Sequence, residues 1–260
     1  MKPEYSNWVP PKLKREMVCA TIVFAIFTIL SCLLLKGTAR WIMTIILIVI
    51  TYNCGWMTWW CYSTAKAFSY DGDLKFSKKI VEGTASYVSI PDGGTCLDVG
   101  CGSGALSIAV AKRHPRAKVI GCDRWGKDYD NFSKKLCERN AKAEGVSNVT
   151  FQNGNAIKLP FPDETFDVIT SNYVYHNIFG KNKQDLLLES LRVLKKGGTF
   201  AIHDLMSKAR YGDMNAFVKK LKDMGYEDVA LIDTTNGRFM TKKQESKYKL
   251  KGSTILYGRK

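Results

Sequence analysis

The hydropathy pattern begins with two long apolar runs near the N-terminus. Met17–Leu35 holds 19 residues without a charge, and Trp41–Tyr62 holds 22 more. Each run is long enough to cross a hydrocarbon core of about 30 Å as a helix. The five residues "KGTAR" between them predict an antiparallel hairpin. A cleaved signal peptide is disfavoured, because the first run is too long and no A-x-A site follows it; a hairpin buried in a soluble core is the other interpretation.

Basic residues flank this hairpin unevenly, and only Lys36 and Arg40 lie in the connecting loop. The flanks carry Lys2, Lys12, Lys14 and Arg15 on one side, and Lys66, Lys75, Lys78 and Lys79 on the other. The positive-inside rule therefore predicts two membrane spans, at about 17–35 and 41–62, with both ends in the cytoplasm. An aromatic belt at the cytoplasmic interface is expected from Trp56, Trp59, Trp60 and Tyr62.

After Tyr62 the pattern changes to short β-rich runs that alternate with charged segments of helical period. The predicted strands lie at 95–100, 118–123, 149–153, 166–171, 199–204, 229–233 and 253–258. The predicted helices lie at 74–89, 104–113, 127–144, 182–195 and 213–224. This alternation predicts an α/β fold with a parallel sheet and helices on both faces. No obvious helix separates the last two strands, which predicts a hairpin with an antiparallel last strand. The interpretation divides the chain into a hairpin, residues 1–63, and an α/β domain, residues 64–260.

Charge and cysteine content narrow the partners and the compartment. The net charge of +15 favours anionic partners, such as nucleic acid, an acidic membrane surface or an anionic substrate. None of the eight cysteines has C-x-x-C spacing, and no tight Cys/His cluster offers a metal site. We therefore expect reduced cysteines that serve as small core residues in a reducing compartment.

The segment "TCLDVGCGSGAL" carries the clearest chemical signal. Its spacing, Gly100-x-Gly102-x-x-Ala105, satisfies the fingerprint of dinucleotide-binding folds. Asp98 precedes the loop, and a carboxylate there would repel a pyrophosphate but attract an ammonium group. Asp123 ends the second predicted strand, where it can accept hydrogen bonds from both ribose hydroxyls, in NAD as well as in other nucleosides. Asp98 therefore favours S-adenosylmethionine (SAM), which has an amino group and a sulfonium and no phosphate.

Residues 74–205 together resemble the class I SAM-dependent methyltransferases, in particular the small-molecule branch with the ubiquinone and menaquinone methyltransferases. The resemblance rests on "LDVGCGSG", "VIGCDRW", "NGNAIKLPFPDETFDVITSNYVYHNI" and "LLESLRVLKKGGTFAIHDL". It implies a Rossmann-like seven-stranded sheet with an antiparallel last strand. It also implies cofactor contacts from Asp98, Gly100, Gly102, Gly104, Asp123, Trp125, Asn155, Ala156 and Asn172. One departure is Asn155-Ala156, where the family usually has Asp-Ala beside the adenine; an amide oxygen can still accept that hydrogen bond.

The residues after the fourth and fifth predicted strands are expected on the substrate side. They are Tyr173, Tyr175, His176 and His203. His176 could be a general base for an O–H or N–H acceptor, or a histidine that only packs at a helix start. A metal site at His203-Asp204 is not expected, because adjacent strand residues point to opposite faces.

The sequence thus predicts a membrane-anchored methyltransferase that acts on a small lipophilic or membrane-resident acceptor. A SAM-binding sensor without catalysis, or an enzyme for a soluble metabolite or RNA that is anchored only for localisation, are the alternatives. RNA ranks lowest, because the chain shows no appended RNA-binding module. The basic stretch Asn236–Gly252 could touch lipid phosphates or be a solvated face.

Overall fold

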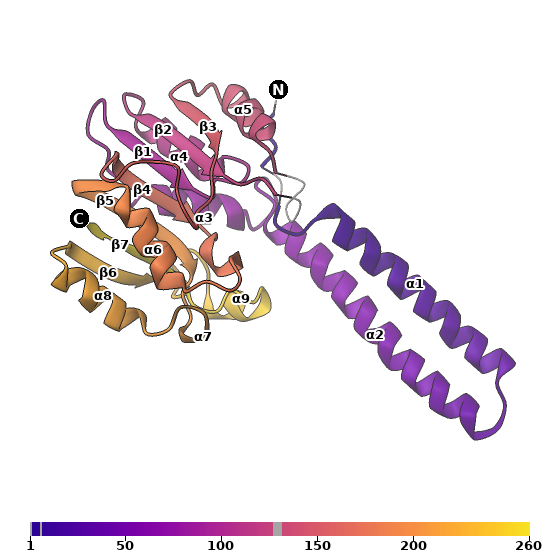
Figure 1. Ribbon diagram of the computed structural model, residues 1–260. Coiled ribbons are helices and arrows are strands. Elements are labelled where there is room, and N and C mark those ends of the chain that lie inside the picture. The colour runs from indigo at the N-terminus through magenta and orange to yellow at the C-terminus, as the bar shows by residue number, and fades with distance from the viewer. Residues whose placement is uncertain (1, 6, 127–131) are drawn as a thin grey trace. The chain divides into compact units, whose positions relative to one another are not determined.

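The computed structural model describes residues 2–5, 7–126 and 132–260 and divides into two compact units (Figure 1). One unit is Asn7–Lys75, and the other joins Met1–Ser6 to Phe76–Lys260. The chain therefore leaves the larger unit once, forms the smaller unit, and returns. The second helix of the smaller unit continues to Ala67, past the boundary predicted at residue 63.

The smaller unit is a helical hairpin of α1 (Pro11–Leu34) and α2 (Gly37–Ala67). Pro11 suits the first turn of α1, where its missing N–H leaves no hydrogen bond unmade. Both helices are long and apolar enough to cross a membrane by length and composition. The placement of polar and apolar side chains in the hairpin also indicates the kind of surroundings that it suits.

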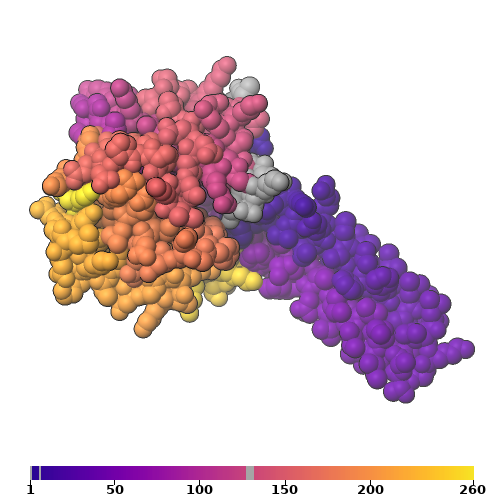
Figure 2. Space-filling model, viewed as in Figure 1, coloured from indigo at the N-terminus to yellow at the C-terminus, as the bar shows by residue number. Residues whose placement is uncertain are grey.

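Hydroxyl groups join the two helices of the hairpin. Three pairs lie within hydrogen-bond distance: Thr21–Thr58 at 3.1 Å, Thr28–Thr51 at 3.2 Å and Ser31–Thr44 at 2.8 Å. Large apolar side chains are exposed instead, among them Ile29, Leu33, Ile45 and Val49. The surface of the hairpin is drawn in indigo and purple in Figure 2. This arrangement reverses that of a soluble helix pair, and it is the one expected where the surroundings are apolar.

The larger unit is built on a seven-stranded sheet in the order β3-β2-β1-β4-β5-β7-β6 (Figure 1). The strands are β1 (Thr95–Val99), β2 (Lys118–Asp123), β3 (Val149–Asn153), β4 (Phe166–Asn172), β5 (Leu194–Leu205), β6 (Glu227–Asp233) and β7 (Ser253–Arg259). Strands β1 to β5 pair in parallel, and β7 is antiparallel to both of its neighbours, β5 and β6. The predicted α/β, Rossmann-like fold with an antiparallel last strand is confirmed.

Helices connect these strands largely where the sequence predicts them. They are α3 (Phe76–Ala85), α4 (Ala105–Arg113), α5 (Lys134–Ala143), the 3₁₀ turn η2 (Tyr175–Asn177), α6 (Lys183–Arg192), α7 (Lys208–Tyr211), α8 (Met214–Asp223) and α9 (Lys242–Lys247). Ser133 caps α5 by accepting from Leu136 N, and residues 127–131 of the helix predicted from 127 lie outside the described residues.

The short helix α9 corrects the expectation that β6 and β7 are joined without a helix. Thr241 and Gln244 form a reciprocal capping box that satisfies the first amides of α9. The sequence did not predict this helix, because a segment of six mostly charged and polar residues has no hydrophobic periodicity.

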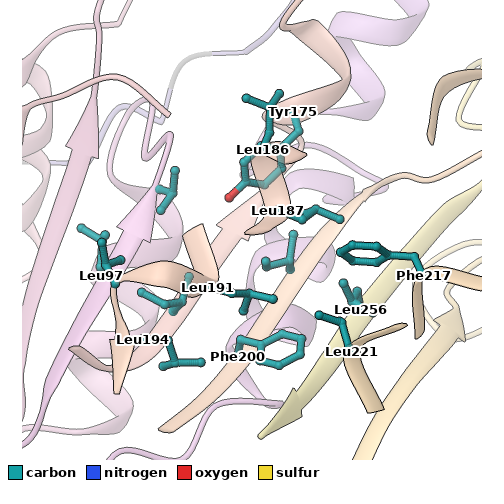
Figure 3. Close-up of a cluster of buried hydrophobic side chains, with 14 of the residues drawn as sticks. Leu97, Tyr175, Leu186, Leu187, Leu191, Leu194, Phe200, Phe217, Leu221 and Leu256 are labelled. Atoms are coloured by element: carbon teal, nitrogen blue, oxygen red, sulfur yellow. The ribbon is translucent and has the colours of Figure 1, made fainter. Parts of the chain in front are cut away.

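The main core lies against β5 and β7, beneath α6 and α8. It includes Leu187 and Leu191 from α6, Phe217 from α8, and Phe200 and Leu256 from the sheet (Figure 3). All five side chains are almost fully buried. This packing holds the carboxyl ends of β4 and β5 in place, and the chemically interesting residues lie at those ends.

Candidate active site

The glycine loop between β1 and α4 is one half of the site. Gly100, Gly102 and Gly104 all have positive φ, at 72°, 55° and 81°. The backbone amides of Gly100 and Cys101 donate to the Cys122 carbonyl, so the loop is fixed to the neighbouring strand. A β-carbon on Gly100 would lie 2.3 Å from Val174, which shows how closely the loop after β4 packs on the glycine loop. This close packing requires glycine at position 100, and the positive φ favours glycine at all three positions.

Asp98 lies at the end of β1 with almost no exposed surface. Its carboxylate accepts hydrogen bonds from Ser107 Oγ at 2.5 Å and from Thr170 Oγ1 at 3.2 Å. Burial raises the pKa of Asp98 to about 7, against the effect of these hydrogen bonds. The carboxylate is enclosed beneath the loop and already has two partners, so the ammonium contact expected from sequence remains a prediction.

Asp123 lies at the end of β2, as predicted, and faces the same loop. One carboxylate oxygen accepts from Gly102 N and the other from Trp125 N, both at 2.8 Å. Trp125 has a positive φ of 43°, and its indole donates to the Gly102 carbonyl at 2.9 Å. The structure therefore brings Asp123, Trp125 and Gly102 together into one cluster, and ribose and adenine contacts from these residues remain predictions.

Asn155 and Ala156 follow β3 at the same edge of the sheet. The Asn155 side chain is exposed, and its oxygen accepts from Ile157 N at 3.0 Å, which closes a local turn. The adenine contact predicted for this amide is therefore untested by the geometry. The position of the pair, one strand beyond Asp123, agrees with its predicted place.

A histidine–aspartate pair forms the other half of the site. His176 Nδ1 lies 2.5 Å from Asp204 Oδ1, although the residues are 28 positions apart. The other carboxylate oxygen of Asp204 accepts from the backbone of Tyr175 at 2.8 Å, and Leu205 N donates to Oδ1. Burial acts to raise the pKa of Asp204, but the hydrogen bonds and charge of His176 and the backbone donors outweigh it and hold the pKa below its ordinary value.

This pair has the geometry of a general base. Because an ionised carboxylate only accepts, His176 Nδ1 carries a proton, and in the neutral form of the ring Nε2 has the free lone pair. Within the part of the chain that the structure describes, no protein hydrogen bond is made by Nε2. The His176 side chain is 16% exposed, whereas Asp204 is fully buried. Asp204 therefore orients the ring, and Nε2 is the atom that can accept a proton from a bound molecule.

His203, adjacent to Asp204, lies on the opposite face of β5. It is fully buried, with Nδ1 2.8 Å from Asn172 Oδ1 and Nε2 2.9 Å from Ser253 Oγ. Burial lowers the pKa of His203 to about 3, so the ring is neutral. Both nitrogens have protein partners, and this corrects the expectation that His203 contacts substrate.

Tyr173 is half-buried beside His203, and its φ of 56° is unusual for a non-glycine residue. Its hydroxyl lies 2.8 Å from Ser253 Oγ, and its ring centroid lies 4.6 Å from that of His203. Burial raises the pKa of its phenol. The Tyr173 hydroxyl is thus turned toward Ser253, and its substrate-side role remains a prediction. Asn172 orients His203.

Tyr175 does not belong to the substrate side. Its ring is fully buried in the main core near Leu186 and Leu187 (Figure 3), and its hydroxyl lies 2.8 Å from Ser190 Oγ. The apolar requirement of that core explains the position, because the 3₁₀ turn η2 directs Tyr175 inward and leaves His176 at the surface. Tyr175 is therefore a core residue, and its backbone amide is the part that supports Asp204.

Three residues of this site were not found from sequence: Asp204 as the partner of His176, and Thr234 and Ser253 as partners of His203. The Thr234 and Ser253 hydroxyls are 2.8 Å apart at the point where β6 ends and β7 begins. The signal for Asp204 was available, since "HD" ends a strand that neighbours β4. That Asp204 faces the loop after β4 follows only from the pairing of Asn172 with His203 in the sheet.

Comparisons with known proteins agree with this geometry. A family described as a methyltransferase domain matches residues 90–250, which is more than half of the chain. A demethylmenaquinone methyltransferase of Bacillus licheniformis is 35% identical over 125 residues, covering 48% of this chain and 50% of that protein. An uncharacterised methyltransferase of Schizosaccharomyces pombe is 35% identical over 118 residues, or 44% of this chain and 42% of that one. The chain thus spans about half the length of the curated relatives it matches.

Solved structures share the fold at low identity. The [4+2]-cyclase SpnF superposes with a TM-score of 0.55 at 20% identity, covering 71% of this chain and 81% of that one. A geranyl diphosphate methyltransferase in complex with GPP and sinefungin gives a TM-score of 0.52 at 16% identity, covering 72% and 77%. At such identities these likenesses show the fold alone.

Proposed function

The chain belongs to this methyltransferase-domain family, which confirms the resemblance to class I SAM-dependent methyltransferases, and from that premise we propose that it methylates an acceptor deprotonated by His176. The observation that carries the proposal is the 2.5 Å contact between His176 and buried Asp204. Val174, two residues before His176, packs directly on Gly100 of the glycine loop. The proposed base and the glycine loop proposed to bind the cofactor therefore lie on loops that pack together.

The residues around the glycine loop fit SAM. Glycines without a β-carbon let a cofactor approach the loop backbone closely. Each Asp123 oxygen accepts one backbone amide, from Gly102 or Trp125, and keeps a further lone pair for a ribose hydroxyl. SAM supplies an already activated methyl group, so the protein contributes mainly by positioning. His176 Nε2 adds removal of the acceptor proton, worth typically 10²–10⁴-fold in rate.

We propose that the acceptor is lipophilic and carries an ionisable hydroxyl group, as a reduced quinone does. The relatives named demethylmenaquinone methyltransferases support this class, although they match over only half their length. The hairpin supports it independently, because a membrane anchor brings the enzyme to acceptors that partition into lipid.

We also propose that the hairpin spans the bilayer, with the catalytic domain in the cytoplasm. Exposed Ile and Leu side chains outside and hydroxyl pairs inside favour a lipid environment. The backbone of Glu4, which precedes the hairpin, is held by both groups of the Asn140 side chain, within the larger unit. Because the chain before and after the hairpin folds into one unit, both ends must lie on the same side, and the flanking lysines select the cytoplasm.

The test follows a labelled methyl group. Full-length protein in native-lipid vesicles is given SAM with a labelled methyl group, and the products are partitioned between solvent and water. We expect label in the organic phase and equimolar S-adenosylhomocysteine. Binding of SAM without turnover would instead support a sensor, and label only in water-soluble products would show that the hairpin serves localisation. Carbonate extraction checks the anchor, since release of the protein to the supernatant contradicts it.

A further inference from the structure

The basic segment Asn236–Gly252 joins β6 to β7 at the same edge of the sheet as the candidate active site. Strand β7 is antiparallel to β5 and β6, so β6 runs in the direction of β5, and its end lies at the carboxyl edge. The register places Ser253 opposite Leu205 and Thr254 opposite Asp204. The segment therefore rises beside the residues that hold His176 and His203.

Positive charge is concentrated on this segment. Six basic residues stand against a single acidic residue, Glu245, and all six are exposed: Arg238, Lys242, Lys243, Lys247, Lys249 and Lys251. Lys242 pairs with Asp233 and with Glu245, so the one local carboxylate is already engaged. Six basic residues minus one acidic residue give the segment a net charge of +5, out of +15 for the whole chain. The segment therefore has a strongly positive face.

The lysines are carried on a packed scaffold. Phe239, Met240, Tyr248 and Leu250 of the segment are buried, and the Phe239 ring lies 5.3 Å from that of His203. The capping box of α9 fixes the turn that carries Lys243 and Lys247. The basic side chains therefore have defined positions at the rim of the site.

We propose that this segment is a docking surface for the anionic lipid headgroups of the bilayer, and this inference rests on the membrane anchoring proposed above. Attraction between lysines and an anionic surface acts within a Debye length of about 10 Å, and an anchor keeps the domain at the membrane, where the segment can come within that distance. Nucleic acid is disfavoured because the aromatic residues Phe239 and Tyr248 are buried, so the segment has no stacking platform for bases. Docking would direct the carboxyl edge, with Nε2 of His176, toward the source of lipophilic acceptor.

The experiment uses full-length protein in nanodiscs of phosphatidylcholine alone or with phosphatidylserine, followed by hydrogen–deuterium exchange. Peptides covering 236–252 are expected to exchange more slowly in the anionic discs, and high salt should remove the difference. The variant K243E/K247E/K251E should lose this protection. Each basic residue near an anionic surface is worth about fivefold in binding, so the triple change should weaken docking by more than a hundredfold.

The matched control is K219E/K220E/K222E, which reverses three exposed lysines of α8. These lysines lie at the end of α8 that leads into the start of β6, away from the carboxyl edge of the sheet. The control variant should keep the lipid-dependent protection. Equal exchange in neutral and anionic discs would overturn the docking surface, as would protection by added RNA in neutral discs. The docking surface would also be overturned if K243E/K247E/K251E raised the KM for acceptor equally in both kinds of disc, because the lysines would then contact the acceptor itself.

Failure of the proposed function has different signatures. Lipid-dependent protection without any methyl transfer would contradict the enzymatic activity and leave the docking surface standing. Protein that washes out of both kinds of disc would contradict the anchor, and with it the basis of this inference.

Discussion

Two histidines lie on opposite faces at the carboxyl end of β5, and they differ in exposure and in hydrogen bonding. On one face, His176 bonds Asp204 through Nδ1 and keeps a partly exposed ring. On the other face, His203 has no exposed surface, and both of its nitrogens have protein partners. The residue type is the same, but only His176 has a nitrogen that a substrate can reach. The comparison teaches that chemistry at this edge depends on which face of the strand a side chain occupies.

The comparison breaks most directly at His176. His176→Ala removes the base and should lower kcat by about 10²–10⁴-fold, with the Kd for SAM unchanged. Steady-state kinetics and calorimetry on the same preparation check both parts. An unchanged kcat would show that positioning of SAM and acceptor suffices without a base.

Asp204 should act through His176. Asp204→Asn would favour the wrong tautomer of the ring, and we expect kcat to fall by about a hundredfold. The double variant His176→Ala/Asp204→Asn should be no slower than His176→Ala alone, because groups that act as a unit are not additive. Losses that multiply in the double variant would contradict the pairing.

His203 should affect stability more than chemistry. His203→Ala leaves partners of a buried ring unsatisfied, at about 1–3 kcal/mol of unfolding free energy, and should change kcat by less than about threefold. The folded pKa of about 3 lies below the ordinary value, so the unfolded chain binds more protons between pH 6.5 and 3. Wild-type stability should therefore fall as the pH drops through this window. The part due to His203 should be absent in His203→Asn, measured by denaturant unfolding at pH 7 and pH 5.

Ser253 should give the smallest effect. Its hydroxyl lies between Tyr173 and His203, and Ser253→Ala should cost about 1 kcal/mol of stability. Thr254→Ala, on the neighbouring position of β7, is the control, because it removes a hydroxyl that does not serve His203. A loss of kcat in Ser253→Ala at unchanged stability would place the Tyr173 hydroxyl in the chemistry.

Sequence was sufficient to place the glycine loop and Asp123 at neighbouring strand ends, because their signals are local. The glycines must follow β1 directly, and Asp123 ends the next strand, so a single βαβ unit contains the whole pattern. The antiparallel last strand was also predictable, since the residues between the last two strands show no helix long enough for a parallel crossover. The fold is confirmed to that extent.

The acceptor half depends on contacts between distant residues, and sequence could not specify them. His176 meets Asp204 only because Asn172 of β4 pairs with His203 of β5. Tyr175 was misassigned because a tyrosine beside a predicted base resembles a site residue, while its place in the core depends on the packing of α6. The capping box of α9 is local, but lysine-rich composition concealed it.

The most direct test of the difference between the two histidines is chemical rescue in the full-length protein. His176→Gly and His203→Gly are assayed for methyl transfer with increasing imidazole. We predict that imidazole restores activity to His176→Gly, and that more basic imidazoles restore more, because a general base follows Brønsted behaviour. His203→Gly should keep its activity without imidazole. Rescue of His203→Gly alone, or no rescue of an inactive His176→Gly, would contradict the assignment of His176 as the base.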